Sequence, residues 1–247
     1  MNVFLNSITG MEDGIATLYF SKRSWDPVKD NQLRMDWRSL QREFDGFSLS
    51  NEEKEGADRC EERIKTFCKY AWEHTAMLDF ITISVCVEGM HRAGQDDWDA
   101  HAKRYDNRII RSSTRLADFQ PGEMSDWYKG KIIPTDIALG MMGVMIPDQI
   151  FVNDENGNPI SYVKATNGYI RQDLKDDRDV KRGLYMQSIP SNFIFKCNMA
   201  QWAHVYKLRN INTSAHPEVK ELAETIQDLI EEQMPWFNRE FIMSVKV

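Results

Sequence analysis

The sequence predicts an α+β fold in which strands form a sheet and helices pack beside it. Three stretches predict this class. Residues 80–87 are β-branched and apolar and are followed by Glu88-Gly89, which makes them the best strand in the chain. Residues 193–209 have the pattern of a strand followed by a capped helix, and residues 217–233 carry an amphipathic stripe. We therefore expect one sheet, with residues 80–87 near its centre.

The N-terminal part predicts one clear helix. Val3-Phe4-Leu5 favours an extended segment, whereas residues 14–20 fit a buried strand or a helix equally well, because periodicity cannot decide between them. Residues 48–53 supply helix-start residues with acids in the first turn, so we expect a helix over 51–73. Its apolar face has helical spacing and consists of Cys60, Ile64, Phe67, Cys68 and Ala71.

A basic window follows the predicted central strand. Residues 90–105 are expected to be helical, and Lys103 to Arg115 then carries five basic residues, two serines and a threonine within thirteen positions of an otherwise acidic chain. A basic run is more often a solvated face. Composition alone therefore favours the structural interpretation of this window.

The middle of the chain predicts short elements. Residues 137–145 are typical of a short methionine-rich helix, and residues 150–163 of a hairpin whose turn is supplied by Asn156-Gly157. A further short helix should follow residues 173–179, with Val180, Leu184 and Tyr185 inward. With no repeat and no long linker, we expect a single domain over 1–247.

The last third predicts a strand, a helix, a loop and a second helix. Asn198 is the expected cap of the first helix, with Gln201 answering as in a capping box, and Trp202, Val205 and Leu208 form its apolar face. Arg209 then lies at the helix exit, where a lone cation usually just complements the helix dipole. The second helix, 217–233, has the pattern of core or subunit interface.

Composition restricts the class of protein. A net charge of −7 argues against broad nucleic-acid coating but allows a local anion pocket. The four cysteines, Cys60, Cys68, Cys86 and Cys197, form no CxxC pair, so buried thiols are expected rather than disulfides or metal ligands. No run is long enough to span a membrane, and the start lacks a basic region followed by an apolar core, so we expect a cytoplasmic protein.

Several of these motifs together resemble the flavin-dependent thymidylate synthase family. The resemblance rests on Asn198, Leu208-Arg209, residues 217–233 and Pro235-Trp236, and on the window Lys103–Arg115, which ends in Ser113-Thr114-Arg115 as the family signature does. It implies a mixed or antiparallel central sheet flanked by helices, a homotetramer with shared sites, and a hairpin insertion at about 148–164.

The resemblance also implies the roles of individual residues. The nucleotide-binding positions of the family are kept, and Arg209 and Ser113 would be the catalytic pair, with Arg209 stabilising charge on the pyrimidine and Ser113 donating a hydrogen bond. The implied substrate-binding residues are Arg115, Arg182, Arg209, Ser113 and Ser112. The implied flavin-binding residues are His74, Lys103, Arg104, Tyr105, Arg111, Asn198 and His204.

Several flavin positions depart from the family pattern. The opening Arg-His-Arg of the signature is Lys103-Arg104-Tyr105 here, its middle serine is Arg108, its asparagine is Ile110, and the arginine that should follow Asn198 is Ala200. Positive charge is therefore kept, while the hydrogen-bond pattern is not. The resemblance thus identifies a divergent member in which the nucleotide half of the site is better kept than the flavin half.

The implied activity is methyl transfer to C5 of deoxyuridylate. FAD would be the flavin, methylene-tetrahydrofolate the carbon donor and NADPH the reductant, and the partners would be a pyrimidine deoxynucleotide monophosphate and further copies of the chain, without membrane or nucleic-acid polymer. Two alternatives remain: a related flavoenzyme that leaves another group, such as hydroxymethyl, and a non-catalytic nucleotide-binding homologue that has lost flavin. A metal site built from Asp96, Asp97, Asp99 and His101 has the ligand types but no clear spacing.

Overall fold

The computed structural model describes residues 1–21, 26–100, 107–113, 123–165, 167–177, 180–181, 184–210 and 215–246. The chain clusters into two compact units. The first unit comprises Met1–Asn2, Val87–Asp97 and Ile110–Phe193, and the second comprises Val3–Cys86, Trp98–Ile109 and Ile194–Val247.

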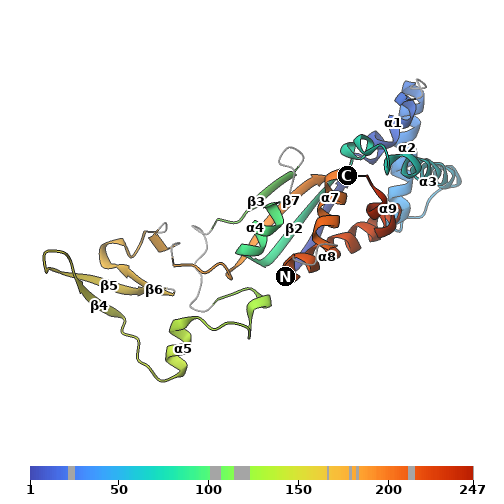
Figure 1. Ribbon diagram of the computed structural model, residues 1–247. Helices are drawn as coiled ribbons and strands as arrows, with labels where there is room; N and C mark the ends of the chain where they lie inside the picture. The colour runs from blue at the N-terminus through green and yellow to red at the C-terminus, as the bar shows by residue number, and fades with distance from the viewer. Residues whose placement is uncertain are drawn as a thin grey trace. The chain divides into compact units, whose positions relative to one another are not determined.

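A four-stranded sheet has the order β1 (Asn2–Thr9), β2 (Thr82–His91), β7 (Pro190–Asn198) and β3 (Asn107–Arg111), and Figure 1 shows these strands. The predicted strand at 80–87 is confirmed as β2, an interior strand. It begins two residues later than expected, because Thr75–Phe80 forms the 3-10 helix η1. Along β7, Phe193, Phe195 and Cys197 are buried while the residues between them are exposed, which is the alternation of a sheet covered on one face.

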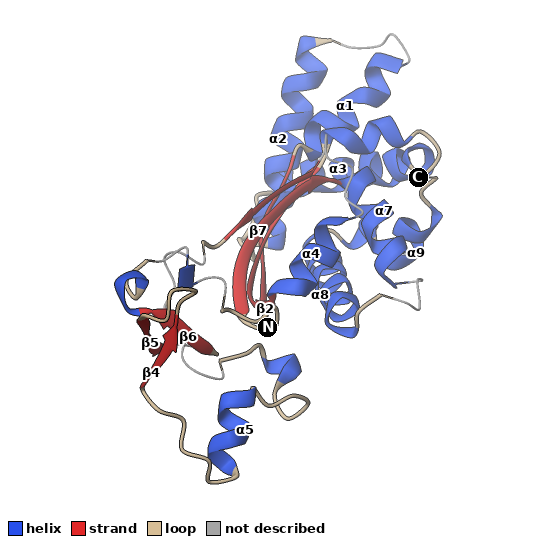
Figure 2. Ribbon diagram, turned by 60° about the vertical axis from the view of Figure 1, so that its left-hand side comes forward, coloured by secondary structure: helices blue, strands red, loops and turns tan. Residues whose placement is uncertain are grey.

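Helices of the second unit cover that face. Figure 2 shows α7 (Met199–Asn210) and α8 (Pro217–Gln233) on one side of the sheet. Two side-chain hydrogen bonds join these helices: Trp202 Nε1 donates to Gln227 Oε1 at 2.9 Å, and the Tyr206 hydroxyl bonds Glu224 Oε1 at 3.1 Å. The chain ends with the 3-10 helix η4 (Pro235–Phe237) and α9 (Arg239–Ser244).

The N-terminal helices complete the second unit. Residues 14–20, which fitted two alternatives, belong to α1 (Met11–Ser21), where a side chain on Gly14 would meet Ile81 Cγ1 at 3.1 Å. The expected helix at 51–73 is confirmed as α3 (Asn51–Ala71), and Ser50 and Glu53 form a reciprocal capping box. Its neighbour α2 (Pro27–Phe44) contributes the buried Asp36, which pairs with Arg59 and Arg63 of α3 at 2.8 and 2.7 Å.

One part of the expected cap of α7 is wrong. Asn198 Oδ1 accepts from the backbone N–H of Gln201 at 2.7 Å, as predicted. The Gln201 side chain does not answer it, because neither its Oε1 nor its Nε2 has a hydrogen-bond partner among the described residues. Gln201 is only 3 % exposed, and its side-chain amide does not reach back to the cap.

The first unit contains a three-stranded antiparallel sheet, which Figure 1 shows beside α5 (Thr135–Met141). Its strands are β4 (Gln149–Asn153), β5 (Pro159–Ala165) and β6 (Gly168–Arg171). The predicted hairpin is therefore confirmed, and Phe151 pairs with Ser161 in its register. Gly157 takes the left-handed conformation (φ +81°), but Asn156 does not. The third strand was not anticipated; it follows a turn at Asn167, the described non-glycine residue with positive φ (63°).

Other short elements of the first unit differ from expectation. The methionine-rich helix ends at Met141 rather than 145, because Gly143 takes a left-handed conformation (φ +74°). Short 3-10 helices form at Asp126–Tyr128 (η2) and Gln172–Leu174 (η3). Val180 was expected to face inward but is 37 % exposed, and residues 178–179 and 182–183 of the expected helix lie outside the described residues.

Candidate functional site

The predicted site residues fall into three groups. Arg209, Asn198, His204 and His74 belong to the second unit, and Arg111, Ser112 and Ser113 to the first. Lys103, Arg104, Tyr105, Arg115 and Arg182 lie outside the described residues.

In the second unit, β7 and α7 position three of the predicted residues. Asn198 ends the strand and caps the helix, and the backbone N–H of Met199 donates to Ile81 O of the neighbouring segment at 2.8 Å, which fixes the start of α7. His204 is half-buried and lies six residues after Asn198. Arg209 lies in the last turn of α7 and is only 2 % exposed.

The burial of Arg209 bears on whether this cation only complements the helix dipole or has a more specific role. A cation that only complements a helix dipole usually keeps its charge in water, since an arginine is almost never fully buried without partners. The second cation of this last turn, Lys207, donates its ammonium to Val245 O, a structural contact with the segment after α9. The burial of Arg209 is therefore not typical of a cation that only complements a helix dipole.

His74 does not lie on β7 or α7 with Asn198, His204 and Arg209. It is an exposed residue at the start of η1, where its side chain makes no capping hydrogen bond. Its neighbour Glu73 pairs with Lys246 at 2.7 Å, and this hydrogen-bonded ammonium lowers the pKa of the carboxyl. The Glu73-His74 pair thus lies on an exposed surface.

In the first unit, Arg111 ends β3 and is held by α4 (Arg92–Ala100). Its Nη1 forms an ion pair with Asp96, and its Nη2 donates to the backbone O of Gln95 at 3.1 Å. The guanidinium therefore donates two hydrogen bonds to consecutive residues of α4. Asp96, considered above as a metal ligand, is used by this arginine.

Ser112 is held by β7 through three hydrogen bonds. Its backbone N–H donates to Asn192 O at 2.8 Å, its Oγ accepts from Asn192 N at 3.1 Å, and its Oγ lies 2.9 Å from Ser191 Oγ. Asn192 Oδ1 in turn accepts from Gly89 N of β2 at 3.0 Å. Ser113 follows directly and is exposed.

Asn192 and Ser191 were not identified from the sequence as site residues. They follow Pro190 and precede an apolar run, a pattern that predicts the end of the preceding helix and not a functional site. Ser112 and Asn192 are 80 positions apart, so no local pattern connects them. The one available signal was two consecutive polar residues at the beginning of an apolar strand.

The cysteines do not provide a nucleophile. All four are free, Cys60 and Cys197 are buried, and Cys68 and Cys86 are partly buried, as expected. Burial raises the pKa of the Cys60 and Cys68 thiols to about 12 and that of Cys197 well above its ordinary value. A protonated thiol is a poor nucleophile, so Cys60, Cys68 and Cys197 are not suited to nucleophilic catalysis.

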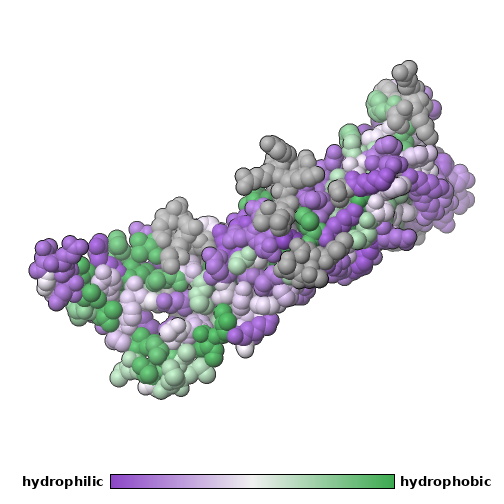
Figure 3. All heavy atoms as spheres, in the orientation of Figure 1, coloured by the Kyte–Doolittle hydropathy of each residue, from purple (hydrophilic) through white to green (hydrophobic). Residues whose placement is uncertain are grey.

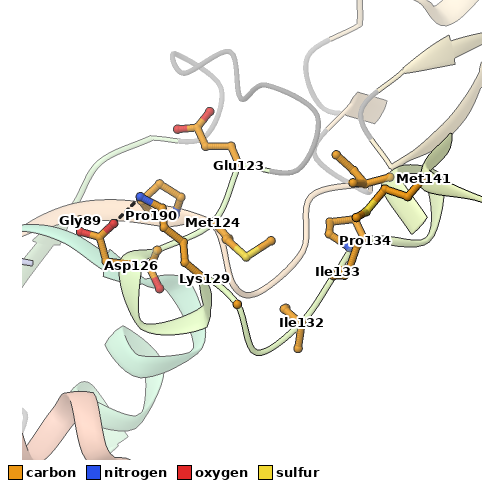
Figure 4. A pocket seen from close by; sticks show the side chains of 13 residues that line it. Gly89, Glu123, Met124, Asp126, Lys129, Ile132, Ile133, Pro134, Met141 and Pro190 are labelled. Carbon is orange, nitrogen blue, oxygen red and sulfur yellow. Dashed lines mark hydrogen bonds and ion pairs between the residues drawn. The ribbon is translucent and has the colours of Figure 1, made fainter. Parts of the chain in front are cut away.

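A cavity of about 500 Å³ lies in the first unit, and Figure 4 shows the side chains that line it. Gly89 and Pro190 line it close to the Ser112 bonds, and Asp126 forms an ion pair with Lys129 at its polar side. The remaining wall is largely apolar: Met124, Ile132, Ile133, Pro134, Ile137 and Met141. From the sequence, only a short helix over residues 137–145 is expected in this part of the chain.

The surface beside this cavity carries several exposed apolar side chains. Figure 3 shows hydrophobic residues gathered over α5 and its flanking segments. Met141, Met142 and Met145 are 73 %, 70 % and 89 % exposed. Exposed apolar surface of this kind is typical of a contact with another molecule.

In the part of the chain that the structure describes, no helix combines the length and the apolar character needed to cross a membrane.

Comparison with protein families and solved structures gives consistent results. The family model described as "thymidylate synthase complementing protein" matches residues 31–236. A crystal structure of flavin-dependent thymidylate synthase ThyX from Helicobacter pylori, complexed with FAD and dUMP, aligns over 97 % of this chain and 99 % of that chain, with a TM-score of 0.51 and 12 % identity. This likeness supports the fold.

A second structure of ThyX from Helicobacter pylori, with FAD and dUMP, aligns over 98 % of this chain and 100 % of that chain, with a TM-score of 0.49 and 12 % identity. No curated protein matched the sequence.

Proposed function

The chain belongs to the family of thymidylate synthase complementing proteins, and from this premise we propose that it is a flavin-dependent thymidylate synthase that methylates C5 of deoxyuridylate. The observation that carries the proposal is the family match over residues 31–236, which includes β2, β3, β7, α7 and α8. The solved relative bound to FAD and dUMP supports these two molecules as cofactor and substrate. Methylene-tetrahydrofolate as carbon donor and NADPH as reductant are further parts of the proposal.

Arg209 is the proposed electrostatic centre of the reaction. Its guanidinium is held in the last turn of α7, whose orientation is fixed by the Asn198 cap and by the Trp202–Gln227 hydrogen bond. A buried, fixed cation stabilises negative charge better than a solvated one, because it needs no reorganisation when the charge develops. Charge on the pyrimidine as C5 becomes nucleophilic would be stabilised in this way.

Ser113, Arg115 and Arg182 are proposed to hold the nucleotide. A phosphate needs forked donors in fixed geometry, which arginine provides and lysine does not. Ser113 follows the tightly held Ser112 and would donate its hydroxyl hydrogen to the nucleotide. Ser112 has its Oγ and its backbone N–H engaged by β7, so its contribution to binding would come mainly from holding Ser113 in place.

The flavin, when bound, would supply the electrons and carry the one-carbon unit. The described residues fit the flavin in part. The Oδ1 of Asn198 is used by the helix cap, but its amide N–H group remains as a donor. The half-buried His204 lies six residues further along the chain. Arg111 is engaged by Asp96 and Gln95, so its contribution would be charge. Lys103, Arg104, Tyr105 and the exposed His74 complete the proposed set.

The test is flavin binding together with proton release from C5. Purified protein should show the visible absorbance of an oxidised flavin, or acquire it on addition of FAD. With NADPH and methylene-tetrahydrofolate it should then release tritium from 5-tritiated deoxyuridylate and form thymidylate. Tritium release with a different C5 product would instead favour hydroxymethylation. A colourless protein that binds deoxyuridylate but no FAD would favour the non-catalytic homologue.

A matched pair of arginine variants tests the nucleotide site. Arg182→Ala should weaken deoxyuridylate binding by about tenfold or more, the loss of one charge-assisted hydrogen bond. Arg171→Ala is the control, because Arg171 is an exposed residue paired with Asp173 at 2.6 Å. Equal deoxyuridylate affinity in both variants would argue against the assignment.

A further inference from the structure

Asn192 occupies the junction of three strands. It lies on β7, which pairs with β2 on one side and β3 on the other. Its side-chain oxygen accepts from Gly89 of β2 at 3.0 Å, and its backbone exchanges two hydrogen bonds with Ser112, directly after β3, at 2.8 and 3.1 Å. One residue therefore connects both neighbouring strands at the point where β3 ends.

The geometry of Gly89 explains why a side chain is needed here. Gly89 has φ +77°, outside the conformation of a regular strand. The Asn192 amide oxygen accepts this N–H. Asn192 itself is exposed, so burial in a core does not account for its position.

The end of β3 is also held from the other side. Arg111 pairs with Asp96 and donates to Gln95 O of α4. Arg111 and Ser112 are consecutive residues, and each is fixed by a different element, α4 or β7. Ser113 is the next residue and is exposed. The backbone that carries Ser113 therefore leaves the sheet from a doubly anchored position.

We propose that Asn192 is a positioning residue of the nucleotide site, acting through Ser112 to set where Ser113 meets the nucleotide. This inference rests on the proposed function, because it takes Ser113 as a nucleotide contact. Hydrogen-bond geometry in a binding site tolerates small displacements poorly, so loosening Ser112 lowers affinity without removing any group that touches the ligand.

The experiment compares Asn192→Ala with Asn192→Asp. The alanine variant keeps both backbone hydrogen bonds to Ser112 but removes the acceptor for Gly89 N–H, so the backbone of residue 192 that holds Ser112 is no longer tied to β2. Aspartate keeps an oxygen in the same place. Asn153→Ala is the matched control: it makes the same substitution at an exposed residue of β4 in the same unit. Deoxyuridylate binding is measured by calorimetric titration, at raised salt for the aspartate variant so that its added charge is screened. FAD affinity and the unfolding temperature are measured in parallel.

Asn192→Ala should weaken deoxyuridylate binding about fivefold, as expected for one hydrogen bond of average strength. FAD affinity should stay unchanged, and Asn192→Asp and Asn153→Ala should bind deoxyuridylate like the unaltered protein. Equal affinity in Asn192→Ala and the unaltered protein would overturn the inference alone. So would a parallel loss of FAD and deoxyuridylate binding that follows the unfolding temperature, since that pattern marks a purely structural role.

Failure of the unaltered protein to bind deoxyuridylate would instead overturn the proposed function, and the inference with it. Ser191→Ala serves if Asn192→Ala does not fold, because it removes only the Ser191–Ser112 contact of 2.9 Å. Its expected result is a smaller loss of deoxyuridylate affinity, again with unchanged FAD binding.

Discussion

Arg209 could be located from the sequence, but its environment could not. The helix pattern ending at Leu208 placed it at the exit of α7, and the structure confirms that position. Its exposed fraction of 2 % has no signal in the helix pattern of the sequence. Arg111 and Ser112 show the same limit, because Asp96 and Asn192 lie 15 and 80 positions away and no local periodicity links them.

Arg209→Ala should abolish turnover and weaken deoxyuridylate binding by about 10- to 100-fold, the equivalent of one or more charge-assisted hydrogen bonds. Arg209→Lys should restore little, because an ammonium does not reproduce the planar fork. Steady-state tritium release and equilibrium titration measure the two effects. Lys207→Ala is the control in the same turn and should lower stability through loss of the Val245 contact while leaving deoxyuridylate affinity intact. Unchanged deoxyuridylate binding in Arg209→Ala would count against the assignment.

The buried thiols predict a loss of stability at alkaline pH. The pKa values of Cys60 and Cys68 are raised from 9.0 to about 12 by burial. Above pH 9 the unfolded chain releases these protons while the folded chain keeps them, so their contribution to stability is present below pH 9 and is lost as the pH rises toward 12. Urea unfolding at a series of alkaline pH values should therefore show a shallower decline in the variant carrying Cys60→Ala and Cys68→Ala. Parallel declines in both proteins would contradict this prediction.

At the scale of elements, the sequence was informative where local signals agreed. Ser50 and Glu53 define the start of α3, and the β-branched run over 80–87 identifies β2. Residues 14–20 could not be assigned because their helical state depends on packing of Gly14 against Ile81 and Phe67, which are distant in sequence. The four-residue strand β6 is too short to carry an alternating pattern and is specified mainly by its pairing with β5.

The cap of α7 allows its structural and flavin-binding roles to be separated. Asn198→Ala should lower the free energy of unfolding by about 1 kcal/mol, because the Gln201 N–H loses its acceptor. Asn198→Asp keeps the acceptor and adds a favourable charge at the helix start, so stability should be retained. If the amide N–H group contacts flavin, Asn198→Asp should nevertheless bind FAD more weakly. Thermal unfolding and FAD titration of both variants measure this, and undiminished FAD affinity in Asn198→Asp would remove Asn198 from the flavin site.

At the scale of the whole molecule, the resemblance to the family leads us to expect an assembly of several copies. The helical stripe on α8 was expected to form core or interface, and Val219, Leu222, Ile226 and Ile230 are all fully buried within the chain. This stripe is therefore used inside one chain. Exposed apolar side chains occur in both units, and in the first unit Met141, Met142 and Met145 gather at the end of α5.

We predict that the protein is a homotetramer in solution, because sites shared among copies would require it. Light scattering coupled to gel filtration should give about four times the chain mass of 28.9 kDa. Addition of FAD and deoxyuridylate should stabilise this species, since ligands bound between copies favour the assembled state. A stable monomer that still turns over substrate would exclude a shared site.

The hydrogen bonds between Ser112 and Asn192 also bear on how chains of this fold can change in length during evolution. They join the two ends of a long segment, since the residues are 80 positions apart. Closing a flexible segment costs free energy only logarithmically with its length, with about 0.6 kcal/mol for each doubling. Insertions can therefore be gained or lost between these two residues while the four-stranded sheet is kept, and we propose that the β4–β5 hairpin is one of them. Length differences among relatives are accordingly expected to concentrate between Ser112 and Asn192.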